Sequence, residues 1–304
     1  MPKTVLPNRE LPGFGRQRTI QPMNEFAHLK DWLGRVDEAD DVLDRRPSIA
    51  LSATLDRDDP PPATGDLLPP LWHWLYFLPA ERQSAIGPDG HPKRGGFLPP
   101  VALPRRMWAG GRFEFIQALR IGEAVKRTSR IADISAKQGR SGALVFVRVR
   151  HEIANEHGVA LTEEHDIVYR DPPAPGAAAE PAKPAPTGEQ FARTITPDPV
   201  LLLRYSALTF NGHRIHYDRN YVTEVEGYPG LVVHGPLIAT LLVDLLRRER
   251  PDAGLTAFEF RAVSPLFDTA PFTVCGRLDD ARNAGLWARG PQGQLAMQAS
   301  ATMA

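Results

Sequence analysis

The sequence predicts an α+β fold made of two similar halves, each combining antiparallel strands with a helix. The chain of 304 residues is long enough for two compact units. A stretch rich in proline and alanine separates residues 1–170 from residues 190–304. Short apolar segments divided by glycine-containing turns occur on both sides of it, a pattern typical of antiparallel strands. We therefore expect an N-terminal half, a linker and a C-terminal half.

The predicted linker spans residues 171–189, which read DPPAPGAAAEPAKPAPTGE. This composition contains nothing that could form a core, and its prolines favour an extended, semi-rigid spacer. It is the clearest boundary in the chain.

Alternating or β-branched apolar residues predict four strands in each half. The tripeptide Phe-Glu-Phe occurs twice, at residues 113–115 and 258–260, each time near the start of a strand series. This matching position indicates that the two halves are related in organisation. The predicted strands are residues 112–121, 125–136, 141–154 and 161–169 in the first half, and 255–263, 271–278, 284–289 and 295–303 in the second.

A long buried helix is predicted at residues 236–250, before the strands of the second half. Pro236 suits a first helical turn, and arginines near residue 250 complement the negative end of the helix. Apolar residues cover most of its circumference, which indicates burial on all sides. The first half has a poorer counterpart at residues 67–78, where prolines stand at both ends of an aromatic run. We therefore expect a degenerate first half and a catalytic second half.

Composition excludes several classes of partner. Lys plus Arg and Asp plus Glu both number 36, so no net field attracts nucleic acid or an anionic membrane. No apolar run reaches the roughly 18 residues of a membrane span. A single cysteine, Cys275, excludes an intrachain disulfide framework and favours a reducing compartment. We therefore expect a cytoplasmic protein that binds neither nucleic acid nor membrane.

The strongest chemical signal is in residues 205–218, which read YSALTFNGHRIHYD, followed by Val233-His234-Gly235-Pro236 at the start of the buried helix. This stretch resembles the MaoC-like dehydratases, and more closely the hydroxyacyl-thioester dehydratase type 2 family with its mesaconyl-C4-CoA (itaconyl-CoA) hydratase branch. The resemblance implies a double hot-dog fold, an acyl thioester of coenzyme A or acyl-carrier protein as substrate, and reversible hydration of a 2-enoyl group. It also implies a homodimer.

The resemblance carries the catalytic histidine onto His216, because Ile215-His216 matches the end of the wider pattern G-D-x-N-P-x-H. The Asp of that pattern falls on Asn211 and its Asn on His213. Asparagine cannot act as a general base. Either His216 performs all the proton transfer while Asn211 orients water, or His213 takes over part of the carboxylate's work.

Hydration of a conjugated thioester needs a base for water, a proton for the α-carbon and a donor for the developing enolate oxygen. His216 is our candidate for proton transfer. Gly235, at the start of the helix, can present a backbone N–H to the thioester oxygen without steric hindrance. The residues expected to bind substrate are His234, Arg204 and Tyr205, and other candidates for the coenzyme A phosphates are Lys93, Arg94, Arg105 and Arg106.

Structural roles remain open for the same residues. Asn211 could only shape the Asn-Gly turn, His213 could orient its neighbour, and Gly235 could be an ordinary helix start. A zinc site made of His213, His216 and His234 is disfavoured, because no Cys or Glu accompanies them and their spacing is not that of a helical metal motif. We expect no metal site.

A serine or threonine nucleophile is also disfavoured, since neither Ser206 nor Thr209 lies in a G-x-S-x-G elbow. The sequence thus predicts a hydro-lyase acting on a short, carboxylated or branched enoyl-CoA such as mesaconyl-C4-CoA or itaconyl-CoA. Coenzyme A enters only as part of the substrate, and no other cofactor is expected. The alternatives are a 3-hydroxyacyl-thioester dehydratase of fatty-acid synthesis, an acyl-CoA thioesterase, and a non-catalytic acyl-CoA-binding protein.

Overall fold

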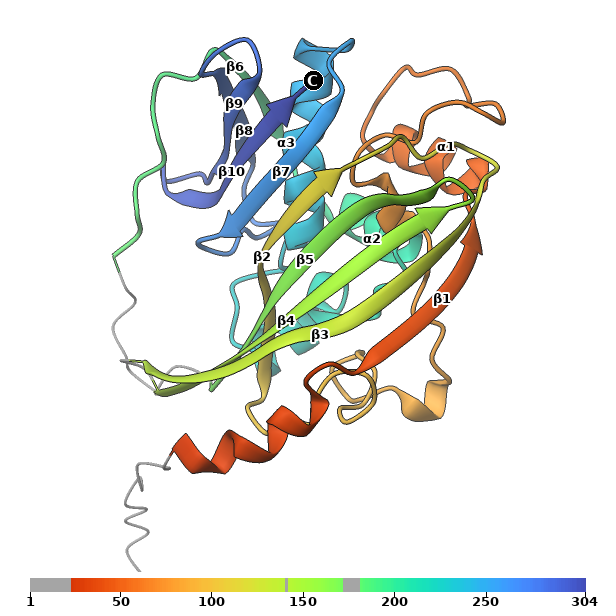
Figure 1. The fold of residues 1–304 in the computed structure, drawn as a ribbon. Helices are drawn as coiled ribbons and strands as arrows, with labels where there is room; N and C mark the ends of the chain where they lie inside the picture. Colours follow the sequence, from red (N-terminus) through yellow and green to blue (C-terminus); the bar gives the residue numbers. More distant parts are fainter. Residues whose placement is uncertain (1–22, 140–141, 172–180) are drawn as a thin grey trace, which may run out of the picture.

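A single ten-stranded antiparallel sheet curves across the molecule, and a long helix lies against it. The computed structural model describes residues 23–139, 142–171 and 181–304. Figure 1 shows α3 (Gly235–Glu249) along one face of the sheet, where it packs against strands of the second half. None of the helices in these ranges is long and apolar enough to cross a membrane.

The first half contributes five strands, one α-helix and three 3-10 helices to the described residues. In chain order these are η1 (Met23–Trp32), β1 (Val36–Val42), α1 (Arg45–Thr54), η2 (Trp72–Leu75), η3 (Gln83–Ala85), β2 (Arg105–Phe115), β3 (Ala124–Gly139), β4 (Gly142–Asn155) and β5 (Gly158–Arg170).

The second half contributes five strands, two α-helices and two short irregular helices. They are β6 (Phe191–Ile195), α2 (Pro199–Leu208), η4 (Arg214–His216), η5 (Tyr221–Val225), α3, β7 (Leu255–Ala262), β8 (Phe272–Leu278), β9 (Asn283–Arg289) and β10 (Leu295–Met303). The predicted linker lies between β5 and β6, and its residues 172–180 fall outside the described residues.

The two halves have mirrored strand orders that meet at β2 and β7. The order in the sheet is β1-β3-β4-β5-β2-β7-β10-β9-β8-β6. At the junction Phe113 is paired with Phe258, so the first residues of the two Phe-Glu-Phe tripeptides lie directly opposite each other. Their rings lie 5.9 Å apart between centroids, and both are almost fully buried. The repeated tripeptide therefore marks the seam between the halves.

Helix α3 confirms the predicted central helix of the second half. Residues 237–246 are all buried, including Thr240 and Asp244. A helix that is apolar around its whole circumference becomes stable only when it is enclosed, and α3 packs against β6, β8, β9 and β10. The same apolar core includes Phe113, Leu161 and Trp72 of the first half, so the two halves share one interior.

The helical counterpart predicted at residues 67–78 is wrong. Only the short η2 forms there, and Leu71 and Phe77 on either side of it have left-handed φ angles of 69° and 54°. Prolines 69, 70 and 79 leave too few residues for a regular helix. Instead His73 and Trp74 contact the buried carboxylate of Glu163 on β5, at 3.0 and 3.1 Å.

Helix α1 was not predicted, although its start carries a recognisable signal. The Asp44 side chain accepts a hydrogen bond from the N–H of Arg46 at 2.8 Å and caps the helix. Its apolar residues are too few to show a helical period. It packs against α2, and it follows β1 as α2 follows β6.

Two edge strands were missed and one predicted strand was displaced. β1 reads VDEADDV and lies at the edge of the sheet with most of its side chains exposed, so apolar alternation is absent. β6 occupies the other edge. The strand expected at residues 112–121 is β2, which begins and ends earlier, because Leu119 and Ile121 pair with the loop at Leu68 and Asp66.

Asp244 is a buried charge in the apolar helix α3, with 1% of its surface exposed. Its carboxylate accepts from Arg57 at 2.5 Å, from Arg193 at 3.2 Å and from Arg248 at 2.8 Å. Arg193 and Arg248 also donate to the carbonyl of Leu55 in the first half. This network ties the end of α1 to the central helix.

Candidate active site

The motif of residues 205–218 folds as the end of α2, a tight turn and the short helix η4. Phe210 has a left-handed φ of 49°, which ends α2. The Oδ1 atom of Asn211 then accepts a hydrogen bond from the N–H of His213 at 3.0 Å. Arg214 and Asp218 form an ion pair across η4 at 2.8 Å. The Asn211 oxygen thus shapes the turn, one of the two roles considered for this residue.

His216 is held in one orientation and one tautomer. Its ring is 7% exposed, and its Nδ1–H donates to the carbonyl of Val232 at 2.7 Å. This bond leaves Nε2 as the hydrogen-bond acceptor. Burial lowers the pKa of His216 to about 4, although the bond to Val232 opposes this effect. The imidazole is therefore neutral near pH 7, the form that can accept a proton.

His234 stacks on the ring of His216. The two rings are stacked with centroids 3.7 Å apart and an interplanar angle of 17°. His234 is fully buried at the N-cap of α3, and its Nε2 lies 2.8 Å from the Oγ of Ser206. Tyr205, which is 2% exposed, also contacts His234, with ring centroids 5.1 Å apart. Both side chains are buried among their neighbours, and their predicted roles in substrate binding stay predictions.

Gly235 is the first residue of α3 and borders open space. A Cβ atom at this position would meet nothing within 4 Å. The intrahelical bonds begin with the N–H of Ile238, which donates to His234. The N–H of Gly235 therefore belongs to the helix start that has no intrahelical acceptor, where the helix dipole favours negative charge. This arrangement is suitable for an oxyanion donor.

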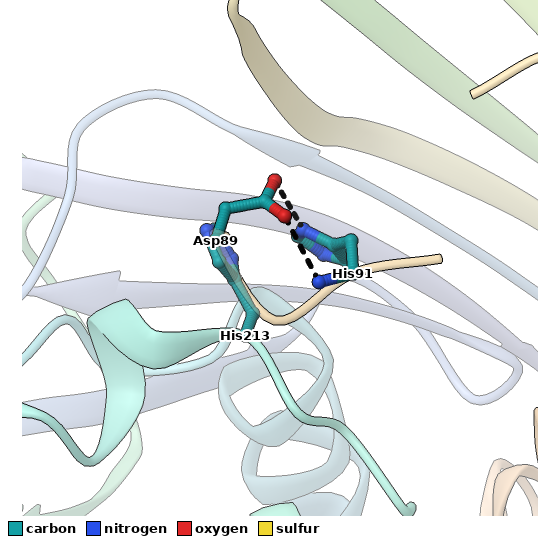
Figure 2. Close-up of side chains that lie close together, drawn as sticks. All are labelled: Asp89, His91 and His213. Carbon is teal, nitrogen blue, oxygen red and sulfur yellow. Dashed lines mark hydrogen bonds and ion pairs between the residues drawn. The ribbon is translucent and has the colours of Figure 1, made fainter. Parts of the chain in front are cut away.

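His213 faces a second histidine and a carboxylate that come from the first half. Figure 2 shows Asp89, His91 and His213 converging, although Asp89 and His213 are far apart in the sequence. The rings of His91 and His213 lie 4.0 Å apart between centroids, and His213 is edge-on to His216 at 5.4 Å. Asp89 accepts from Nδ1–H and the backbone N–H of His91 at 3.2 and 3.0 Å.

The loop that carries Asp89 is attached to η4 through the backbone carbonyls of the loop. The N–H of Arg214 donates to the carbonyl of Asp89 at 2.9 Å, and the guanidinium of Arg214 donates to the carbonyl of Pro88 at 3.0 Å. Gly90 has a φ of 90°, and a Cβ atom there would lie 1.8 Å from the carbonyl oxygen of Gly212. The two glycines thus permit a contact between loops that any side chain would block.

The charge state of this cluster is set by burial and by Asp89. Burial lowers the pKa of His213 to about 2, with a smaller contribution from His91 in the same direction. Burial acts to raise the pKa of Asp89, but the hydrogen bonds from His91 outweigh it and hold this pKa well below its usual range. Near pH 7 the cluster therefore contains neutral histidines beside one ionised carboxylate.

The basic candidates have different positions. Arg204 is exposed on α2, so its role in substrate binding stays a prediction. Arg94 donates to the backbone carbonyls of Val101, Leu103 and Pro104, which makes it a structural residue rather than a phosphate ligand. The expected candidates Lys93 and Arg105 donate to Ser84 and Glu226 respectively.

Residues 71–268 match the family model of hydroxyacyl-thioester dehydratase type 2. The match covers more than half of the chain. The chain belongs to this family. Membership makes it a hydro-lyase, as the motif predicted. The chain is also 49% identical over 271 residues to mesaconyl-C(4)-CoA hydratase of Chloroflexus aurantiacus. The aligned region covers 88% of this chain and 95% of that protein.

Solved structures confirm the predicted double hot-dog fold of this family member. HtdX of Mycobacterium tuberculosis superposes with a TM-score of 0.64 at 16% identity, over 89% of this chain and 100% of that one. A conserved hypothetical protein of the same organism, described as a double hotdog fold, gives a TM-score of 0.55 at 14% identity, over 90% and 96% of the two chains.

The structure gives little support to a serine or threonine nucleophile, or to a metal site made of the three motif histidines. Ser206 and His234 do form a hydrogen-bonded pair, but Ser206 is only 5% exposed and Nδ1 of His234 has no partner to orient it. Thr209 donates to the carbonyl of Tyr205 at 2.8 Å. In the part of the chain that the structure describes, the groups with donor atoms close enough for a metal ion are Asp89-His91-His213 and His151-Glu163-His165, not the three histidines of the motif region.

Sequence reasoning missed Asp89 and His91. Both lie in the turn Pro88-Asp89-Gly90-His91-Pro92, and only the basic residues that follow this turn were predicted to have a role. The sequence pattern that could have indicated them is an Asp and a His two residues apart in a turn rich in glycine and proline. Such turns are common, and only the packing of this turn against Gly212 gives it significance.

Proposed function

We propose that this protein is a hydratase that reversibly adds water to the C=C bond of a short, carboxylated 2-enoyl-CoA of the mesaconyl-C4-CoA type. The observation that carries the proposal is the 49% identity between this chain and a mesaconyl-C(4)-CoA hydratase, over 95% of the length of that hydratase. The neutral, oriented His216 beside the start of α3 supplies the chemistry that such a reaction needs.

In the proposed reaction the water oxygen forms a bond to the β-carbon while Nε2 of His216 accepts one water proton. The electron pair of the double bond moves toward the thioester carbonyl, whose oxygen is stabilised by the N–H of Gly235. The proton then passes from His216 to the α-carbon. Proton transfer of this kind contributes about 10²- to 10⁴-fold, and loss of one oxyanion donor costs about 10²- to 10³-fold.

The other parts of the proposal follow from the same site. Asn211 has its amide nitrogen left to orient water, and Arg204 on α2 contacts the coenzyme A part of the substrate. The reaction needs no metal or redox cofactor, because the chain itself provides the base and the oxyanion donor. Itaconyl-CoA is a second expected substrate. We also propose a cytoplasmic homodimer, and size-exclusion chromatography with light scattering tests the dimer.

The test follows loss of enoyl absorbance with mesaconyl-C4-CoA, itaconyl-CoA, crotonyl-CoA and a longer 2-enoyl-CoA, while free coenzyme A is monitored. We expect hydration of a carboxylated substrate and a loss of at least about 100-fold in His216→Ala. His157→Ala is the matched control, because His157 is 66% exposed in a hairpin turn between β4 and β5.

Each alternative function has its own outcome in this assay. Preference for the long chain favours a dehydratase of fatty-acid synthesis, and release of free coenzyme A indicates a thioesterase. Tight binding of the thioesters without turnover would mean that the protein is a non-catalytic binder, and the proposal would be wrong.

A further inference from the structure

We propose that Asp89, on the loop between η3 and β2, is the carboxylate that holds the attacking water together with His213, and that His91 positions Asp89. The active site is then built from both halves of the chain. This inference rests on the proposed hydration and adds to it a charged acceptor for the attacking water, beside the amide nitrogen of Asn211. The bonds made and broken remain those of the proposed reaction, with the proton passing to His216.

The chemistry of the motif leaves a gap that a carboxylate would fill. A water molecule that attacks a carbon atom must be oriented by hydrogen-bond acceptors, and a charged acceptor binds more strongly than a neutral one. The carbonyl oxygen of the Asn211 side chain already accepts from the N–H of His213, and it carries no full negative charge. Burial lowers the pKa of both His91 and His213, so these histidines are neutral near pH 7 and supply no negative charge.

Asp89 lies where it can meet this requirement. A carboxylate oxygen of Asp89 and a ring nitrogen of His213 lie within 4.8 Å of each other. One water molecule can bridge two such atoms with hydrogen bonds of about 2.8 Å. The side chain of Asp89 is 34% exposed, so water can reach it. His213 is edge-on to His216, with ring centroids 5.4 Å apart, so His213 links the Asp89 carboxylate to the proposed base.

His91 fixes the carboxylate for this role. Its Nδ1–H and its backbone N–H both donate to Asp89, which stabilises the ionised form and limits rotation of the side chain. A carboxylate oxygen accepts more than one hydrogen bond, so capacity for water remains. The same division of work, in which one residue orients the reacting group through another, is common in catalytic triads.

A purely structural role does not require the Asp89 side chain to be charged. The loop is attached to η4 by the carbonyls of Pro88 and Asp89, which belong to the main chain. The turn itself needs only an acceptor for the N–H of His91, and an asparagine provides one. Asp89→Asn therefore removes the charge and keeps both the attachment and the turn.

The test compares kcat and KM of Asp89→Asn, Asp89→Ala and His91→Gln with those of the wild-type protein on mesaconyl-C4-CoA. We expect kcat of Asp89→Asn to fall about 100-fold with KM changed by less than about threefold, and formate to restore at least about tenfold in Asp89→Ala. The matched control is Asp280→Asn, because Asp280 accepts from the N–H two residues ahead in an exposed turn, as Asp89 does. The control should keep its activity.

Three results would overturn the inference. Wild-type kcat in Asp89→Asn would show that the charge is not needed, and failure of formate to rescue Asp89→Ala would show that the side chain acts only on structure. Loss of wild-type activity on chelation, with recovery on adding Zn²⁺, would show that the cluster binds a cation. If the wild-type protein hydrates none of the thioesters, the proposed function fails, and this inference fails with it.

Discussion

Replacing Asp244 with asparagine should destabilise the fold by about 3 kcal/mol. Asp244 is buried in α3 and accepts hydrogen bonds from Arg57, Arg193 and Arg248. Asparagine has nearly the same shape, but it removes the charge that three guanidinium groups share. Breaking a buried ion pair costs about 3 to 5 kcal/mol, and the lower end applies here because solvent can reach the arginines. Their side chains are 13%, 27% and 31% exposed.

The measurement is urea unfolding followed by tryptophan fluorescence, supported by thermal scans. A loss of about 3 kcal/mol corresponds to a fall in Tm of about 5 °C, because the unfolding entropy is about 2 cal/mol/K per residue. Asp279→Asn is the control, since Asp279 pairs with Arg277 at 3.0 Å with both side chains about half exposed. Exposed pairs contribute less than about 1 kcal/mol.

Equal and small losses in the two variants would refute the reasoning, because burial of Asp244 would then add nothing to the value of its ion pairs. A double-mutant cycle with Arg57 sharpens the result. Arg57 belongs to the first half and Asp244 to the second, so a large coupling energy would show that this pair stabilises the contact between halves.

Three further predictions concern the site and the core. His216, with a pKa lowered to about 4, resists protonation in the folded state, whereas the unfolded chain takes up this proton below about pH 6.5, so the free energy of unfolding should fall as pH drops from 7 toward 4; urea midpoints at several pH values test this, and an unchanged slope in His216→Gln would contradict it. Gly90→Ala should lower kcat strongly while Tm changes little, because the added Cβ would displace the loop from Gly212. Normal activity of this variant would show that the loop contact is dispensable. Leu241→Ala, at a site 2% exposed in α3, should cost about 2 to 5 kcal/mol in urea unfolding, and a cost below about 1 kcal/mol would mean that α3 is loosely packed.

Much of the second half could be predicted from local pattern. The apolar run from residue 236 reads as a buried helix because hydrophobic spacing reports on the environment of each face, and α3 occupies nearly those residues. The motif at residues 205–218 identified the family from residue identities alone, and the two Phe-Glu-Phe tripeptides indicated the related halves that β2 and β7 join.

The tertiary structure decided the features that depend on contacts between distant segments. The edge strand β1 reads VDEADDV and has too few apolar residues to show alternation, and β6 has only five residues. The aromatic run near residue 72 failed to form the expected helix, and His73 and Trp74 instead turn toward the carboxylate of Glu163. Periodicity predicted neither outcome, because it describes neighbours along the chain.

The sequence by itself determined the chemical class of this protein, its two-part organisation and the identity of His216 and Gly235 as candidates. Only the tertiary structure decided that His234 stacks behind His216 and that Asp89 meets His213, residues that are more than 100 positions apart. The physical reason is that the chemistry of a side chain depends on the residue type alone. The distance between two loops depends instead on the register of the sheet and on glycines that allow close contact between backbones.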